Sequence, residues 1–227
     1  MSVITNDEST SETAICVLIV DDDSWTTRAI TLALDEAPEI GSLRTAHSGE
    51  QAIAEYIASR PDVTLMDLNM PPGMSGITAI EQIRLHDPTA HIVVLTTVSP
   101  GPGIARALEA GAIAVLRKTA SENNLRSVVL AAARGEEPKL LKHLAQDIII
   151  SNDELPEAPA VAPRLTPAER EILLLIADGL GYENIAQSQG ISVWTARTHV
   201  KRLREKLYAD NLAQLVVRAL QYRFISA

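Results

Sequence analysis

The chain has 227 residues, of which 46% are hydrophobic and 22% are charged, a balance typical of a soluble protein with a buried core. Aromatic residues make up only 3%, too few for the stacking surface of a single-strand nucleic-acid binder. A single cysteine, Cys16, excludes a disulfide framework and a multi-thiolate zinc site. Cys16 stands in an apolar run, so we expect it to be buried in the core.

No apolar run approaches the roughly 18 residues that a membrane span needs, which excludes an integral membrane protein. Residues 1–13 lack the basic and apolar parts of a secretory signal, so we expect a cytoplasmic protein. The net charge of −9 is unevenly distributed. Residues 1–160 carry 11 basic and 23 acidic side chains, whereas residues 161–227 carry 9 and 6. An acidic body with a basic tail indicates two domains, the tail being the candidate for binding a polyanion.

From Ala14 onward, short apolar runs alternate with segments of helical periodicity. The predicted strands cover residues 15–20, 43–46, 63–66, 91–95 and 112–116. The predicted helices cover residues 24–37, 50–59, 75–86, 104–110 and 121–134. Five such units predict a parallel sheet covered by helices on both faces, and right-handed crossovers favour a doubly wound α/β domain.

The pattern changes after this domain. Residues 140–150 are predicted to form a connecting helix, and three prolines within residues 151–164 indicate a semi-stiff linker. The rest of the chain is predicted to be a four-helix domain, whose first helix opens with the capping box Thr166-Pro-Ala-Glu169. The other three helices are predicted at residues 182–188, 192–207 and 212–225.

Polar side chains stand at the carboxyl ends of four predicted strands: Asp21 and Asp22, Asp67, Thr96, and Lys118. In an open parallel sheet, this edge is where ligands bind. Three carboxylates at close range repel one another unless a cation lies between them, and an oxygen-only site suits Mg²⁺. With a lysine and a hydroxyl beside them, such groups can hold a phosphoryl group on a carboxylate.

The helix predicted at residues 192–207 is basic on one side and apolar on the other. Its basic residues are Arg197, Lys201, Arg202, Arg204 and Lys206, against the single acid Glu205; Val193, Val200, Leu203 and Leu207 form the apolar stripe. As the second helix of a helix-turn-helix, it would enter the DNA major groove. We expect Trp194, near its start, to pack against neighbouring helices.

Two independent sets of motifs in this chain resemble known families. Val17-Leu-Ile-Val-Asp-Asp22, Leu65-Met-Asp-Leu-Asn-Met-Pro71, Val93-Val-Leu-Thr96 and Leu116-Arg-Lys118 resemble the receiver domain of bacterial two-component response regulators. The tail, from Leu165-Thr-Pro-Ala-Glu-Arg-Glu-Ile172 through Thr198-His-Val-Lys201 to Lys206-Leu207, resembles the helix-turn-helix domain of the NarL/FixJ (LuxR-type) family. The resemblance implies a receiver domain at 14–135, a linker at 136–164 and a DNA-binding domain at 165–227.

The resemblance also implies a role for individual residues. Asp67 is the phosphoacceptor for a sensor histidine kinase; Asp21, Asp22, Asp67 and the backbone carbonyl of Asn69 hold Mg²⁺; Thr96 is the switch hydroxyl and Lys118 its ion-pair partner. The DNA-contacting residues are Arg197, Thr198, Lys201, Arg202 and His199, and the last helix pairs two DNA-binding domains into a homodimer. Two positions depart from the family: Val115 replaces the switch aromatic, and Pro72 lengthens the loop after Asp67.

Two other functions are weighed against a phosphorylation-switched transcription factor, which is not an enzyme beyond accepting its own phosphoryl group. One is a phosphohydrolase of the haloacid-dehalogenase type, because Asp21 and Asp23 form an Asp-x-Asp pattern. It would require Thr or Val where Trp25 stands, and it leaves the basic tail unexplained. The other is a DNA-binding regulator whose receiver works without phosphorylation, which Val115 favours.

Overall fold

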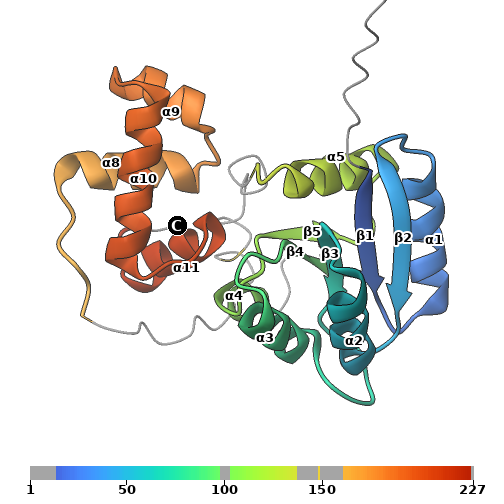
Figure 1. The fold of residues 1–227 in the computed structure, drawn as a ribbon. Coiled ribbons are helices and arrows are strands. Elements are labelled where there is room, and N and C mark those ends of the chain that lie inside the picture. Colours follow the sequence, from blue (N-terminus) through green and yellow to red (C-terminus); the bar gives the residue numbers. More distant parts are fainter. Residues whose placement is uncertain (1–13, 98–102, 137–147, 149–160, 226–227) are drawn as a thin grey trace, which may run out of the picture.

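The computed structural model describes residues 14–97, 103–136, 148 and 161–225 (Figure 1). They form an α/β domain followed by a bundle of helices. Among these residues, none of the helices combines the length and the apolar character that crossing a bilayer requires. The helix predicted at residues 140–150 lies, apart from Ile148, outside the described residues.

The first domain is built on a five-stranded parallel sheet in the order β2-β1-β3-β4-β5 (Figure 1). Its strands are β1 (Ile15–Val20), β2 (Ile40–Ala46), β3 (Val63–Asp67), β4 (Ile92–Thr96) and β5 (Ala114–Arg117). The intervening helices are α1 (Ser24–Asp35), α2 (Gly49–Ser59), α3 (Gly76–His86), α4 (Ile104–Glu109) and α5 (Glu122–Ala133). The doubly wound α/β prediction is confirmed.

Apolar side chains cover both faces of the sheet because the buried strands carry almost nothing else. Leu18 and Val20 face one core with the buried sides of α2, α3 and α4, whereas Val17 and Ile19 face the other with those of α1 and α5. β2 begins three residues earlier than predicted. It is an edge strand, half exposed and mixed in polarity, so backbone pairing with β1 defines it rather than an apolar run.

The second domain consists of α8 (Pro167–Ala177), α9 (Tyr182–Gln189), α10 (Val193–Leu207) and α11 (Leu212–Gln221). The predicted capping box is present: Thr166 Oγ1 accepts from the Glu169 N–H, and the Glu169 carboxylate accepts from the Thr166 N–H. Ser192 caps α10 through the Thr195 N–H. α11 ends four residues before the predicted Ile225 because the chain turns there through Arg223, whose φ is 56°.

Candidate functional site

Three acidic side chains meet at the carboxyl edge of the sheet. Asp21 follows β1, Asp67 ends the neighbouring β3, and the register pairs Val20 with Met66, which sets the two acids side by side. With Asp22, they offer carboxylate oxygens that all lie within 4.8 Å of one another. Asp21 and Asp67 are buried and Asp22 is exposed, so the cluster is open to solvent on one side.

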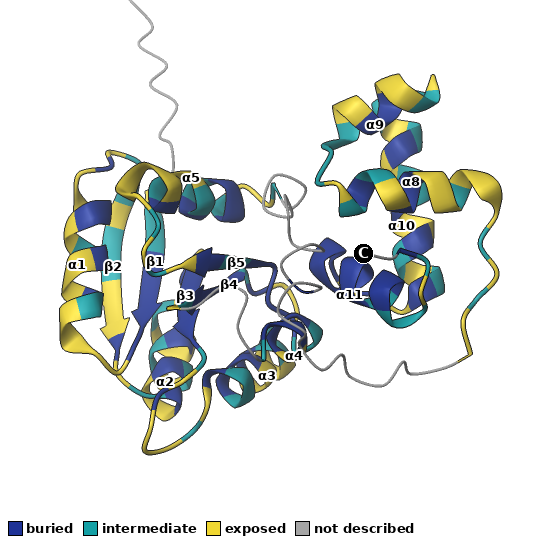
Figure 2. Cartoon of the chain, turned by 180° about the vertical axis from the view of Figure 1, so that it is seen from behind, coloured by how far each residue is buried: buried dark blue, intermediate teal, exposed yellow. Residues whose placement is uncertain are grey.

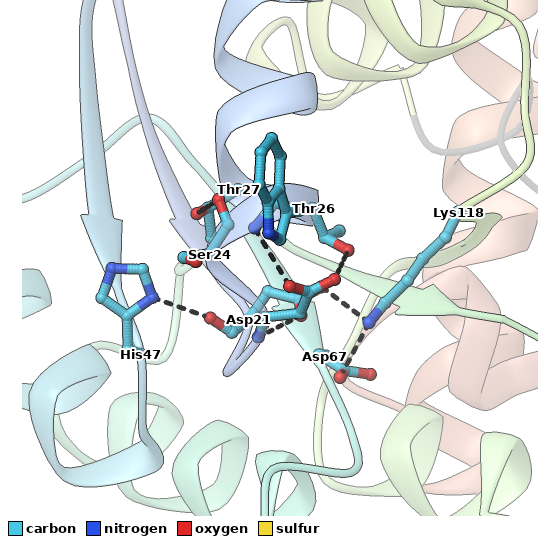
Figure 3. A network of polar contacts seen from close by, with 9 residues as sticks. Asp21, Ser24, Thr26, Thr27, His47, Asp67 and Lys118 are labelled. Atoms are coloured by element: carbon cyan, nitrogen blue, oxygen red, sulfur yellow. Dashed lines mark hydrogen bonds and ion pairs between the residues drawn. The ribbon is translucent and has the colours of Figure 1, made fainter.

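Lys118 reaches into this cluster from the end of β5 (Figure 3). Its Nζ lies 2.6 Å from Asp21 Oδ2 and 2.9 Å from Asp67 Oδ2. The backbone N–H of Lys118 donates to the Thr96 carbonyl at 2.7 Å. Burial raises the pKa of Asp21, and Lys118 offsets only part of that effect. Burial also acts to lower the pKa of Lys118, but the hydrogen bonds that Lys118 donates to the two carboxylates outweigh this effect, and the net pKa lies above 10.5.

The residues present fit a hard divalent cation. The donors are all oxygens, and one lysine leaves two of the three carboxylate charges uncompensated. Asn69, the fourth predicted ligand, stands two residues after Asp67 and is exposed. A donor set made only of oxygens, with an excess of negative charge, suits Mg²⁺.

Asp23, the third acid of the Asp21–Asp23 run, is not in the cluster. It caps α1: one carboxylate oxygen accepts from the Trp25 N–H at 3.0 Å and the other from the Thr26 hydroxyl at 2.8 Å. These bonds lower the pKa of Asp23, first through Thr26 and then through Trp25. The Asp21–Asp23 pair of the phosphohydrolase pattern is therefore split, with Asp21 in the cluster and Asp23 at the helix cap.

Three residues that the sequence reasoning did not select support the cluster. The His47 ring nitrogen Nδ1 lies 3.0 Å from the Asp21 carbonyl oxygen (Figure 3). The Glu50 carboxylate accepts from the Met74 N–H at 3.1 Å, a hydrogen bond that holds the loop lengthened by Pro72 against α2. A Cβ built on Gly76 would overlap the Asp67 carbonyl oxygen, so only glycine allows α3 to start there. The spacing of these three residues in a single sequence gives no sign that they support the site.

Thr96 and Val115 belong to the neighbouring strands β4 and β5 beside the site. Thr96 is the last residue of β4, half-buried and paired in register with Arg117. Val115 is half-buried and packs against the core that includes α4 and α11. Val115, which replaces the expected switch aromatic, thus packs against a core to which both domains contribute.

Helix α4 of the first domain contacts helix α11 of the second (Figure 1). Arg218 Nη2 lies 2.8 Å from Glu109 Oε2, and Gln214 Nε2 donates to the Glu109 carbonyl at 2.7 Å. Asn211 Nδ2 donates to the Gly111 carbonyl at 3.4 Å. Packed between α4 on one side and α8 and α10 on the other, α11 is buried along most of its length (Figure 2).

The predicted DNA-contacting residues of α10 lie outside its buried stripe. Arg197, Lys201 and Arg202 are exposed, and Thr198 and His199 are half-buried. The opposite stripe is buried in the domain core; it consists of Ala196, Val200, Leu203 and Leu207. The Arg197 guanidinium lies 4.8 Å from the centroid of the Tyr182 ring, a cation–π contact that fixes its direction.

Two expectations from the sequence are wrong. Trp194 does not pack against neighbouring helices: it is 76% exposed, because residue 194 lies on the face of α10 opposite its buried stripe. Cys16 is only partly buried, because it lies in the first, less covered half of β1, where the chain enters the sheet.

The chain matches known protein families in both domains. Residues 17–130 match the response regulator receiver domain, and residues 163–219 match the bacterial regulatory proteins of the luxR family. Neither is a family of catalytic enzymes. The response regulator protein VraR of Staphylococcus aureus (strain Mu3 / ATCC 700698) is 32% identical over 214 residues, which cover 93% of this chain and 99% of that protein.

Solved structures agree with this assignment. The response regulator ChrA of a heme-sensing two-component system aligns with a TM-score of 0.51 and 28% identity, covering 93% of this chain and 99% of that one. The signal receiver domain of the putative response regulator NarL from Mycobacterium tuberculosis aligns with a TM-score of 0.50 and 26% identity, covering 53% and 97%. The chain therefore belongs to the two-component response regulators that join a receiver domain to a LuxR-type DNA-binding domain.

Proposed function

We propose that Asp67 is the phosphoacceptor of this response regulator and that its phosphorylation by a sensor histidine kinase, in the cytoplasm, controls DNA binding. The carrying observation is the geometry around Asp67, where Asp21, Asp22 and Lys118 converge on one carboxylate. In this proposal, residues 14–135 accept the phosphoryl group, residues 165–227 bind DNA and residues 136–164 link the two domains.

In the transfer step, a carboxylate oxygen of Asp67 attacks the phosphorus of a phosphohistidine. The P–N bond breaks, and its electron pair leaves with the imidazole of the kinase. Asp21, Asp22, Asp67 and the Asn69 carbonyl would hold Mg²⁺, which would supply positive charge for the phosphoryl oxygens. Lys118, already 2.9 Å from Asp67, is placed to pair with the transferred group.

The coupling step runs from Thr96 to α4. Thr96 ends the strand that precedes α4, and its hydroxyl is the group proposed to move toward the phosphoryl oxygens. A shift of this segment changes the position of Glu109 and Gly111, the two α4-side partners of α11. Release of α11 frees the helix that we propose to pair two copies of the DNA-binding domain on a two-fold site.

The DNA-reading step belongs to α10. Arg197, Thr198, Lys201, Arg202 and His199 are the proposed contacts, and their side of the helix lies opposite the buried stripe or beside it. Arginine and lysine there can serve phosphates for affinity or guanines for specificity.

Intact-mass measurement after incubation with Mg²⁺ and acetyl phosphate tests the chemistry. We expect one phosphoryl adduct on the wild-type chain and none on Asp67→Asn, with both variants giving the same circular dichroism spectrum. An adduct that persists on Asp67→Asn overturns the assignment of Asp67. The absence of any adduct on the wild type favours the regulator that works without phosphorylation, for which Val115 is the feature in the sequence.

A further inference from the structure

Trp194 stands at a position where an exposed indole requires an explanation. It is the second residue of α10 and 76% exposed. Leaving a large apolar ring in water forgoes roughly 2–3 kcal/mol of burial free energy. Within the described part of the chain, no aromatic ring stacks on Trp194 and no cation lies over it.

The helix geometry places Trp194 at the centre of the face that the domain leaves open. Thr198 and Lys201 follow it at intervals of four and three residues, so the three side chains form one stripe along α10. This stripe lies opposite the buried one. The Thr198 hydroxyl donates to the Trp194 carbonyl at 2.9 Å, so its polar group is already bonded within the helix.

The charge around Trp194 favours a polyanion. Arg197 and Lys201, both exposed, lie within two helical turns of it. Trp25 provides the contrast within the same chain: it is also the second residue of its helix and 79% exposed, but it stands next to Asp22 and Asp23 at the acidic site. The two tryptophans have the same exposure and opposite electrostatic surroundings, so DNA can approach one and is repelled by the other.

We propose that Trp194 contacts base edges in the DNA major groove, its indole lying against thymine C5-methyl groups. The inference rests on the proposed DNA binding by α10 and adds to it. The first residues of a recognition helix are those that reach the bases, and an apolar ring there reads the methyl group that distinguishes thymine. Trp194 is thus a specificity-determining residue that adds an apolar contact to the basic ones.

Single-tryptophan variants test the contact, because the chain has two tryptophans. Trp25→Phe leaves Trp194 as the reporter, and Trp194→Phe leaves Trp25 as the matched control. Both are used as the full chain, treated with Mg²⁺ and acetyl phosphate. The DNA probe is the duplex that the wild-type chain enriches from random-sequence DNA of roughly 30 base pairs, room for two half-sites. We expect this duplex to shift the Trp194 emission and to protect it from acrylamide, and to leave Trp25 unaffected.

A second measurement addresses the base contact itself. Trp194→Ala should weaken binding to the enriched duplex by roughly tenfold, the scale of one lost base contact, while binding to an unrelated duplex stays unchanged. Replacing thymine by deoxyuridine removes the methyl group; it should weaken binding by the wild-type chain and have no effect on Trp194→Ala.

The failures of the two hypotheses are distinguishable. If the wild-type chain enriches a duplex but Trp194 emission and acrylamide quenching stay unchanged, the Trp194 contact is overturned and the proposed DNA binding stands. Equal losses for the wild type and Trp194→Ala on the deoxyuridine duplex also overturn the methyl contact. If the wild-type chain enriches no duplex at all, the proposed function fails and the Trp194 inference falls with it.

Discussion

Arg218 of α11 and Glu109 of α4 form an ion pair of 2.8 Å that joins the DNA-binding domain to the receiver domain. The two side chains are only 13% and 14% exposed. Burial raises the pKa of Glu109, and the charge of Arg218 offsets part of that effect. The carbonyl of the same Glu109 accepts from Gln214, so one residue of α4 holds α11 at two points.

Removing Arg218 should separate the two domains. Arg218→Ala leaves the Glu109 carboxylate buried without its partner, and breaking a buried pair in this way costs roughly 3–5 kcal/mol. We expect a larger radius of gyration by small-angle X-ray scattering. DNA affinity of the unphosphorylated chain should rise roughly 5–150-fold, the usual range of coupling between sites.

Two variants control this experiment. Arg28→Ala removes an exposed arginine from α1 and should change neither quantity. The double variant Glu109→Arg/Arg218→Glu keeps an opposite-charge pair at the contact and should bring both quantities back toward the wild type. An unchanged radius and an unchanged DNA affinity in Arg218→Ala would show that the α4–α11 contact does not restrain the DNA-binding domain.

Lys118→Met should destabilise the receiver domain. The partners of Lys118 hold its pKa above 10.5, so its stabilising contribution is complete below 10.5 and is lost as the pH rises through the folded-state value. Without the ammonium group, Asp21 and Asp67 face each other uncompensated, a loss of roughly 3–5 kcal/mol.

Thermal unfolding with and without Mg²⁺ measures this effect. Mg²⁺ should raise the Tm of Lys118→Met more than that of the wild type, because the cation no longer competes with a lysine for the carboxylates. The neighbouring Arg117 is exposed, so Arg117→Met is the matched control and should behave as the wild type. Equal Tm losses for the two variants would contradict the role given to Lys118.

Much of the receiver domain follows from the sequence because its strands are buried on both faces. Such strands appear as short apolar runs, and the polar residue after each run marks the edge where the site forms. The convergence of Asp21, Asp67 and Lys118 was therefore predictable. β2 was less predictable, because an edge strand with polar side chains is defined by its hydrogen bonds to β1 and not by an apolar run in the sequence.

The contacts between the domains could not be predicted in the same way. Glu109, Gln214 and Arg218 are ordinary helix residues in the sequence, and only the packing of α11 on α4 makes them partners. The prediction that Trp194 is packed against neighbouring helices was wrong for a related reason. Its apolar character indicated burial, but burial is decided by the face of α10, and the stripe of Ala196 and Val200 turns residue 194 outward.

Gly76→Ser should destabilise the receiver domain by more than a typical surface substitution. A Cβ at this position would overlap the Asp67 carbonyl oxygen and crowd the Leu68 backbone, so α3 would have to move away from Asp67. Over-packing of this kind costs roughly 1–3 kcal/mol or more. We also expect slower phosphoryl incorporation from acetyl phosphate, measured by intact mass.

Gly181→Ser is the matched control for Gly76→Ser. Gly181 is the N-cap of α9, where a Cβ would come no nearer than 3.5 Å to Glu183 and where serine is a preferred residue. This variant should be as stable as the wild type in urea unfolding. If Gly76→Ser shows the same unfolding midpoint as Gly181→Ser, the close approach of α3 to Asp67 is wrong.

Acid should destabilise the DNA-binding domain through Glu169. Its carboxylate accepts from Lys206 Nζ at 2.8 Å and closes the capping box on Thr166. The hydrogen bond from Lys206, followed by those from Thr166, lowers its pKa below the ordinary 4.5. A lowered folded-state pKa means that the stabilisation is complete above pH 4.5 and is lost as the pH falls through the folded-state value.

Urea unfolding of the wild-type parent chain, followed by far-ultraviolet circular dichroism between pH 3 and 7 (roughly the span over which carboxylates titrate), measures this loss. Glu169→Gln keeps a capping amide but loses the ion pair with Lys206, so it should be less stable by about 1 kcal/mol at neutral pH. Its stability should also fall less steeply below pH 4.5 than that of the parent chain. Glu183→Gln, on the exposed side of α9, should follow the parent at every pH. A parallel decline of Glu169→Gln and the parent would mean that other carboxylates carry the acid sensitivity of this domain.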